Sequence, residues 1–217
     1  MTDLDEIIEA LKDIPTATLA NALDDVGKFI NSSVSIRPVE PSMRVVGRAL
    51  TVEVEVGEAG TFSSHEFRVG AMIDRAEKGD VIVVAAKGAK ASIWGGMASL
   101  AASVKGISGL VVDGSVRDVD EINACGFNVF SRYVIPTTGR TRLHVKSIGG
   151  PISLDGIAVE SGDIIIGDST GLVVIPHAKA FTVLEKATLY QKDDLQATAE
   201  IRRGISFTEV MKHFKRI

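Results

Sequence analysis

The fold is decided by residues 80–118, which read DVIVVAAKGAKASIWGGMASLAASVKGISGLVVDGSVRD. Two apolar segments, 81–85 and 109–113, are typical of strands in a parallel sheet that is covered on both faces. Between them, residues 87–94 are expected to form a loop and residues 97–105 a helix of small side chains. A strand, a helical crossover and a second strand form a βαβ unit with parallel strands. We therefore predict an α/β protein built around a parallel βαβ core.

On the N-terminal side of this unit, apolar residues at helical spacing predict helices at 3–13 and 16–26. Residues 28–44 are expected to form an irregular connection. Alternating valines predict a strand at 44–56, and a further helix is expected around 64–77.

On the C-terminal side, a short helix is expected at 118–125 and a strand at 127–135. Residues 151–175 contain only strand and turn signals, which predict an antiparallel meander. Amphipathic helices at 178–202 and 206–215 are expected to close the fold.

Bulk composition sets the class of protein. The chain has 217 residues, 45% of them hydrophobic and 24% charged, which is typical of one globular domain spanning residues 1–217. The net charge of -4 argues against a nucleic-acid partner. Cys125 is the only cysteine, the first residues do not resemble a signal peptide, and no apolar run approaches the roughly 20 residues of a membrane helix. We expect a cytoplasmic protein that does not enter a membrane.

One familiar motif is set aside. Residues 167–171 read GDSTG and match the G-x-S-x-G pattern of serine hydrolases. That chemistry needs a turn from a strand into a helix. Here apolar strand-like segments lie on both sides, so we predict a β-hairpin turn.

Two places could carry chemistry. Gly95 and Gly96 open a predicted helix, where free N–H groups and the helix dipole favour an anion. The alternative is that these glycines only make a turn. Arg117 and Asp118 follow the strand at 109–113, where an arginine can hold a carboxylate and an aspartate can hold Mg²⁺ or Mn²⁺. The alternative is that Asp118 caps its helix and Arg117 makes a surface ion pair.

The two places gain meaning if the strands 81–85 and 109–113 are parallel neighbours. Ligands of open α/β sheets bind outside the carboxyl ends of the strands. We therefore expect Gly95-Gly96 and Arg117-Asp118 to face one cleft.

The chain resembles the RraA-like family, which includes 4-hydroxy-4-methyl-2-oxoglutarate aldolases and regulators of ribonuclease activity. The resemblance covers roughly residues 15–205 and is carried by WGG at 94–96, GLVVDGSVRD at 109–118, and GD, GDSTG and VVIP within 162–176. It implies a single-domain swivelling β/β/α-type fold with the parallel core, the antiparallel meander and the C-terminal helices. It also implies homotrimers, in some members paired into hexamers, with sites near the subunit interfaces.

The resemblance further implies a lyase that depends on a divalent metal, Mg²⁺ or Mn²⁺, and acts on small 2-oxo acids. By motif match, Arg117 would bind the substrate carboxylate and Asp118 would anchor the metal, which makes these two the expected catalytic residues. Backbone groups of Gly95, Gly96, Met97 and Ala98 would contact the substrate. The metal would stabilise the pyruvate enolate left by aldol cleavage or by decarboxylation of oxaloacetate-like acids.

The chain departs from the family at one position. Family aldolases tend to carry an acidic residue where this chain has Gly96, so decarboxylation is expected to survive the change better than aldol cleavage. The resemblance also implies an acidic residue from a neighbouring subunit's C-terminal helix, with Asp193, Asp194 and Glu200 as candidates. The alternative function is a non-catalytic regulator that binds an RNA-degrading enzyme. A carboxylate suited to a metal beside an arginine favours the enzyme.

Overall fold

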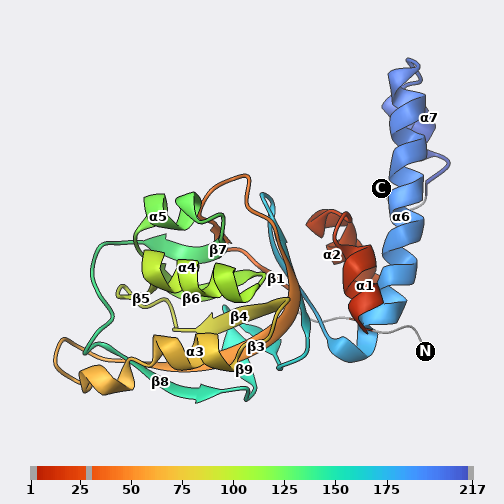
Figure 1. Ribbon diagram of the computed structural model, residues 1–217. Coiled ribbons are helices and arrows are strands. Elements are labelled where there is room, and N and C mark those ends of the chain that lie inside the picture. Colours follow the sequence, from red (N-terminus) through yellow and green to blue (C-terminus); the bar gives the residue numbers. More distant parts are fainter. Residues whose placement is uncertain (1–3, 28–30, 215–217) are drawn as a thin grey trace.

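The computed structural model describes residues 4–27 and 31–214, and its centre is a mixed β-sheet (Figure 1). The strands follow the order β1-β12-β11-β3-β4-β6-β7-β2, with β5 paired to β6 and β8 paired to β3. The strands of this sheet are β1 (Ser32–Ser33), β2 (Arg37–Pro38), β3 (Val45–Val56), β4 (Asp80–Ala85), β5 (Ser92–Trp94), β6 (Gly109–Val116), β7 (Asn128–Val134), β8 (Leu143–Ile148), β11 (Ile164–Asp168) and β12 (Gly171–Ile175). A separate hairpin is formed by β9 (Ile152–Leu154) and β10 (Ile157–Val159).

The predicted parallel core is confirmed. Strand β4 pairs in parallel with β3 on one side and with β6 on the other, and β6 pairs in parallel with β7. The side chains of Val81–Val84 and Leu110–Val112 are fully buried, because layers cover both faces of these strands. The α/β class with a parallel core, an antiparallel meander and C-terminal helices is therefore confirmed.

Helices lie in two groups (Figure 1). Beside the parallel strands lie α3 (Val69–Arg75), α4 (Gly96–Lys105) and α5 (Val119–Ala124). A second apolar cluster joins α1 (Leu4–Leu11), α2 (Thr16–Val26) and the first half of α6 (Ala180–Arg202) to β11 and β12. The second half of α6 extends away from the sheet, and α7 (Phe207–Met211) folds back on it through Ala197 and Val210.

The GDSTG motif is a hairpin turn, as predicted. Strands β11 and β12 are antiparallel, and Asp168 pairs with Gly171 across the tip. The Asp168 carboxylate accepts hydrogen bonds from the backbone N–H of Thr16 at 2.9 Å and from its hydroxyl at 2.7 Å. The hairpin tip thus holds the first turn of α2, and Ser169 does not lie on a strand-to-helix elbow.

The helix predicted around 64–77 is wrong over its first turns. Ser63 and Glu66 form a capping box that closes only a 3-10 turn at Ser64–Glu66. The chain then turns at Phe67, and the guanidinium of Arg68 donates to the Val145 carbonyl at 2.7 Å. The α-helix begins only at Val69, so Phe67 is free to face the site described below.

The strand predicted at 109–113 and the loop predicted at 87–94 also need correction. Strand β6 continues to Val116, and Ser92–Trp94 form the short strand β5 beside this extension. The strand was predicted to end at Asp113 and therefore stopped three residues short of its true end. The carboxylate of Asp113 is instead buried in an ion pair with Arg132 of β7, with 2.7 Å between Oδ1 and Nε.

Two further regions were not resolved by sequence patterns. Strand β8, which pairs with the second half of β3, was not predicted. The connection at 28–44 was expected to be irregular, but it contains β1 and β2, while residues 28–30 lie outside the described part. Within 4–27 and 31–214, no helix is both long and apolar enough to cross a membrane.

Candidate active site

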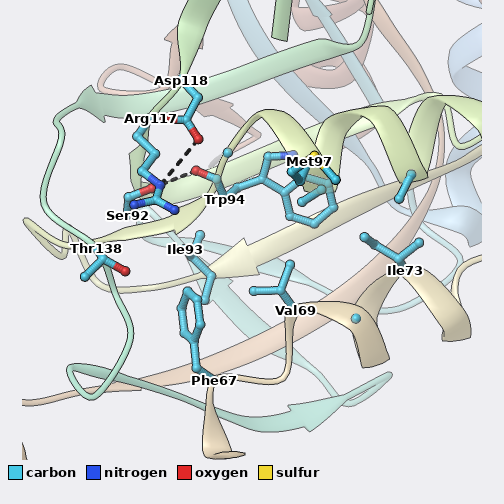
Figure 2. Close-up of a pocket in the computed structure, with 14 residues that line it drawn as sticks. Phe67, Val69, Ile73, Ser92, Ile93, Trp94, Met97, Arg117, Asp118 and Thr138 are labelled. Carbon is cyan, nitrogen blue, oxygen red and sulfur yellow. Dashed lines mark hydrogen bonds and ion pairs between the residues drawn. The ribbon is translucent and has the colours of Figure 1, made fainter. Parts of the chain in front are cut away.

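A pocket of about 350 Å³ lies beyond the carboxyl end of the parallel strands, between α3, the start of α4 and the turn from β6 into α5 (Figure 2). Its polar lining comes from Ser92, Gly95, Arg117, Asp118 and Thr138. Its apolar lining comes from Phe67, Val69, Ile73, Ile93, Trp94, Met97, Ala98 and Ala101. The start of α4 and the Arg117-Asp118 pair therefore face one cleft, as expected.

Gly95 and Gly96 allow the β6–α5 turn to lie directly against the start of α4. The backbone N–H of Gly96 donates to Oδ2 of Asp118 at 3.2 Å. A Cβ atom on Gly95 would lie 2.5 Å from the same oxygen, and a Cβ on Gly96 would lie 2.6 Å from Cβ of Glu121. The glycines are thus required by close packing, which goes beyond the simple turn reading.

The same packing leaves no room for a side chain at position 96. An acidic side chain there would need the space that Glu121 of α5 already fills. Gly96 is buried and does not line the pocket, so its part in the site is its N–H group. Gly95, Met97 and Ala98 do line the pocket.

Asp118 begins α5 but does not cap it with its side chain. Its backbone is left-handed, with φ of 58°, and its carboxylate makes no capping hydrogen bond to α5. The carboxylate turns instead toward Gly96 and toward Arg117, whose Nε lies 3.4 Å from Oδ2. The cap reading is therefore wrong for this side chain. Figure 2 shows both side chains at one end of the pocket.

Hydrogen bonds and ring stacking hold the wall around these residues. The Trp94 indole N–H donates to the hydroxyl of Ser99 at 2.8 Å, and its ring stacks on Phe127 with 6.0 Å between ring centroids. The Trp94 carbonyl accepts the backbone N–H of Arg117 at 3.0 Å. The backbone of Arg117 is thus bound to the backbone of Trp94, whose own side chain is buried.

Charged groups behind the pocket fix the end of the parallel sheet. Arg132 lies between the carboxylates of Asp113 and Asp155, with which it forms ion pairs. Burial alone would raise the pKa of Asp155, but hydrogen bonds from Ser33 and the charge of Arg132 outweigh it and lower that pKa. The Asp113–Arg132 pair therefore links β6 to β7, and the Arg132–Asp155 pair links β7 to the turn between β9 and β10.

The residues present fit a metal of the Mg²⁺ type. Such ions need one or two carboxylates and keep several waters. Asp118 offers one carboxylate with 39% of its side chain exposed, which leaves room for water or substrate oxygens. Within residues 4–27 and 31–214, no cluster of three or more His, Cys, Asp or Glu could hold an ion. The described residues of one chain therefore do not form an all-protein metal cage.

Other predicted acidic residues do not reach this pocket within one chain. Asp193, Asp194 and Glu200 lie on α6 and are absent from the described lining. The lining also contains no lysine among the described residues, and Lys105 of α4 donates hydrogen bonds to the Ile73 and Asp74 carbonyls. The role of Asp193, Asp194 and Glu200 in a neighbouring subunit's site stays a prediction.

Sequence reasoning missed Phe67, Ser92, Ile93 and Thr138. Phe67 fell inside a helix that was predicted too long, and Ser92 and Ile93 fell inside a predicted loop. Thr138 lies in a segment without periodicity. A serine between apolar residues, as at Ser92, was the one usable signal in the sequence.

Fold and site together define a mixed α/β protein with a pocket at the carboxyl edge of a parallel core, whose charged lining residues are Arg117 and Asp118. A family model described as Aldolase/RraA, of the RraA-like family, matches residues 16–174. The chain belongs to the RraA-like family.

Individual relatives agree with this assignment. A Halalkalibacterium halodurans protein named "Putative 4-hydroxy-4-methyl-2-oxoglutarate aldolase" is 34% identical over 190 residues, covering 87% of this chain and 85% of that protein. An uncharacterized Methanocaldococcus jannaschii protein is 30% identical, with 93% of each chain covered.

Solved structures share the fold. An uncharacterized protein from Pseudomonas syringae matches with a TM-score of 0.86 at 26% identity, covering 97% of this chain and 98% of that one. A Streptomyces coelicolor protein, described as an unusual member of the RNase ES inhibitor RraA family, matches with a TM-score of 0.80 at 22% identity, covering 93% and 100%. Both aldolase-named proteins and regulator-named proteins are therefore similar to this chain.

Proposed function

We propose that this protein is a divalent-metal-dependent C–C lyase that acts on small 2-oxo acids. The observation that carries the proposal is the direct contact between the start of α4 and the Arg117-Asp118 pair in one pocket. A protein that only binds another protein has no need of a carboxylate suited to a metal beside an anion-binding arginine. The aldolase names among its relatives support the same class.

The chain's own residues would bind and orient the substrate. The Arg117 guanidinium, 44% exposed, would hold the 2-oxo acid carboxylate through paired hydrogen bonds. The first turn of α4 has N–H groups without partners inside the helix, and those of Met97 and Ala98 would face developing negative charge. Asp118 would hold Mg²⁺ or Mn²⁺, directly or through water. When bound, such an ion supplies Lewis acidity at the keto oxygen.

Decarboxylation suits this lining better than aldol cleavage. Aldol cleavage needs a base to take the proton of the substrate alcohol, whereas decarboxylation of an oxaloacetate-like acid does not. Asp118 is the single carboxylate among the described lining residues, and it is committed to the metal in this scheme. Oxaloacetate is therefore the first substrate to test.

We further propose a homotrimer, with pairing into a hexamer as a second assembly state, in the cytoplasm. Large apolar side chains support an oligomer, because α6 and α7 expose Leu195 at 68% and Phe207 at 61%, while α4 exposes Met97 and Val104 at 82% each. Large exposed apolar patches mark protein–protein contacts, and these side chains would contribute to such patches. An α6 acid would reach a neighbouring pocket only in such an assembly.

The test is pyruvate release from oxaloacetate with Mg²⁺, with and without a chelator, after subtraction of the metal-only rate. Asp118→Ala should lower the protein-dependent rate by about 100-fold or more, a loss typical of removing one key electrostatic group. Asp120→Ala is the matched control, since Asp120 is an exposed neighbour on α5 that does not line this pocket. Circular dichroism should show both variants folded.

Equal rates for wild type and Asp118→Ala would overturn the proposal. If wild-type protein with metal released no pyruvate from oxaloacetate or 4-hydroxy-4-methyl-2-oxoglutarate, the regulator function would take precedence. That second candidate rests on the likeness to the inhibitor-named Streptomyces coelicolor protein.

A further inference from the structure

The pocket is divided into a small charged end and a larger apolar end. Arg117 and Asp118 lie together near Ser92 and Thr138, while Phe67, Val69 and Ile73 lie away from them (Figure 2). The apolar end is formed by α3, by Ile93 of β5 and by the outer side of α4. The head of a 2-oxo acid at Arg117 would thus leave its far end against apolar side chains.

Charge is confined to one end. Among the described lining residues, Arg117 and Asp118 are the only ones that carry a charge. Arg117 is used by the carboxylate next to the keto group in the proposed reaction. A second carboxylate at the far end of a substrate would lose water without gaining a cation or a hydrogen-bond donor, which is costly.

The size of the pocket also favours a ligand with an apolar far end. A volume of about 350 Å³ corresponds to roughly a dozen water molecules at their share of liquid volume. Pyruvate or oxaloacetate alone would leave the α3 side of this space unfilled. An apolar chain would fill it and remove apolar protein surface from water, which favours binding.

We propose that the ligands of this site are 2-oxo acids with one apolar substituent at the far end, an alkyl or aryl group, in place of a far-end carboxylate. The proposal rests on the proposed 2-oxo acid lyase function and specifies its substrate class. In decarboxylation of such an acid, the bond between C3 and the carboxylate carbon attached to it breaks, its electrons form the enolate and carbon dioxide leaves. That carboxylate lies close to the keto group, so an apolar substituent on C3 can still occupy the far end.

The test is calorimetric binding of two unreactive probes of equal chain length, 2-oxohexanoate and 2-oxoadipate, in the presence of Mg²⁺. They differ only in a terminal methyl or carboxylate group. We expect 2-oxohexanoate to bind at least tenfold more tightly. Equal affinity, tighter binding of 2-oxoadipate, or binding of neither probe would overturn the proposal.

Gly70 offers a direct change at the apolar end. It lies in α3, lines the pocket, and a Cβ atom there would meet nothing within 4 Å, so a side chain can be added without a clash. Gly70→Lys should raise the affinity for 2-oxoadipate and reduce the preference at least tenfold. Gly70→Met, of similar length and without charge, should keep the preference. An unchanged ratio in Gly70→Lys would contradict the assignment.

Failure of this proposal can be told apart from failure of the lyase function. Oxaloacetate turnover is measured on the same preparation. Turnover with a preference for 2-oxoadipate would sink the substrate class and leave the lyase standing. A preference for 2-oxohexanoate without turnover of any 2-oxo acid would contradict the lyase function and leave the ligand class standing.

Discussion

At the scale of single residues, the site depends on two backbone features that bring Asp118 to the start of α4. Asp118 adopts a left-handed backbone, which aspartate tolerates better than most residues. Gly95 leaves space for its carboxylate, because any Cβ there would lie 2.5 Å from Oδ2. The position of the carboxylate therefore depends on the lack of a side chain at Gly95 as much as on the hydrogen bond from the Gly96 N–H.

Replacing Gly95 tests this arrangement. Gly95→Ala should displace the Asp118 carboxylate and weaken Mn²⁺ binding about tenfold or more, as losses of groups that orient a metal ligand do. Isothermal titration with Mn²⁺ measures the effect. Gly150→Ala is the matched control, since a Cβ there meets nothing within 4 Å. Unchanged Mn²⁺ affinity in Gly95→Ala would contradict the proposal that Asp118 binds the metal.

Site residues could be predicted where they belong to a recognisable sequence motif, as Arg117 and Asp118 do. What the sequence could not predict is the direction of a side chain. Aspartate at a helix start is a favoured cap, and only the contact with Gly96 from a distant segment turns it away. A contact between segments far apart in sequence therefore determines whether the Asp118 side chain caps its helix or faces the pocket.

At the scale of elements, the tip of the β11–β12 hairpin stabilises α2. Pro15 precedes α2 and provides no side-chain cap, so Asp168 accepts the hydrogen bonds of Thr16 from outside the helix. Burial alone would raise the pKa of Asp168, but the bonds from Thr16 and Thr170 and the charge of Arg44 outweigh it and lower that pKa. The ionised carboxylate is thus favoured in the folded state.

The lowered pKa of Asp168 predicts a pH-dependent contribution to stability. A group with a lowered folded-state pKa stabilises the fold above its unfolded pKa of about 3.9, and this stabilisation is lost as pH falls through the folded value. Asp168→Ala should cost about 1–2 kcal/mol of unfolding free energy at pH 7, the usual cost of losing a cap.

Denaturant unfolding of wild type and Asp168→Ala at several pH values measures this contribution. The difference should stay constant above about pH 5 and shrink in acid below the unfolded pKa. Ser169→Ala, at the same exposed tip, should change neither stability nor activity. A constant difference down to strongly acidic pH would contradict the role of the charge, and loss of activity in Ser169→Ala would revive the hydrolase reading.

The parallel core could be predicted because its strands are apolar on both faces, a pattern with few alternatives. Short or polar strands could not be. Strand β5 has three residues and shows no periodicity, and the end of β6 contains Asp113, which only an ion pair with Arg132 makes acceptable inside a sheet. The pairing of β5 and of the second half of β6 depends on residues elsewhere in the chain, which local sequence patterns do not reveal.

At the scale of the whole molecule, the second half of α6 and α7 form a projecting arm (Figure 1). Its own apolar contacts are few, namely Ala197 with Val210, Met211 and Phe214. An arm of this kind would gain stability from a neighbouring copy, which would also bring acidic α6 residues to another pocket. The proposed trimer therefore links assembly to the site.

Sedimentation equilibrium tests the assembly. Wild-type protein should have three times the mass of one chain, or six times where trimers pair. Leu195→Glu should shift the distribution to smaller species, because it puts a charge on an exposed apolar position of α6. Thr198→Glu adds the same charge at an exposed polar position and should keep the oligomer. A wild-type monomer at assay concentration would refute the trimer.

The most direct measurement is a crystal structure of the protein with Mn²⁺ and oxalate, a mimic of the pyruvate enolate, in which anomalous scattering locates the metal. Oxalate should lie on the Arg117 guanidinium, and Mn²⁺ should be bound by the Asp118 carboxylate directly or through one water. Mn²⁺ and oxalate bound elsewhere, with nothing at Asp118, would contradict the proposed site.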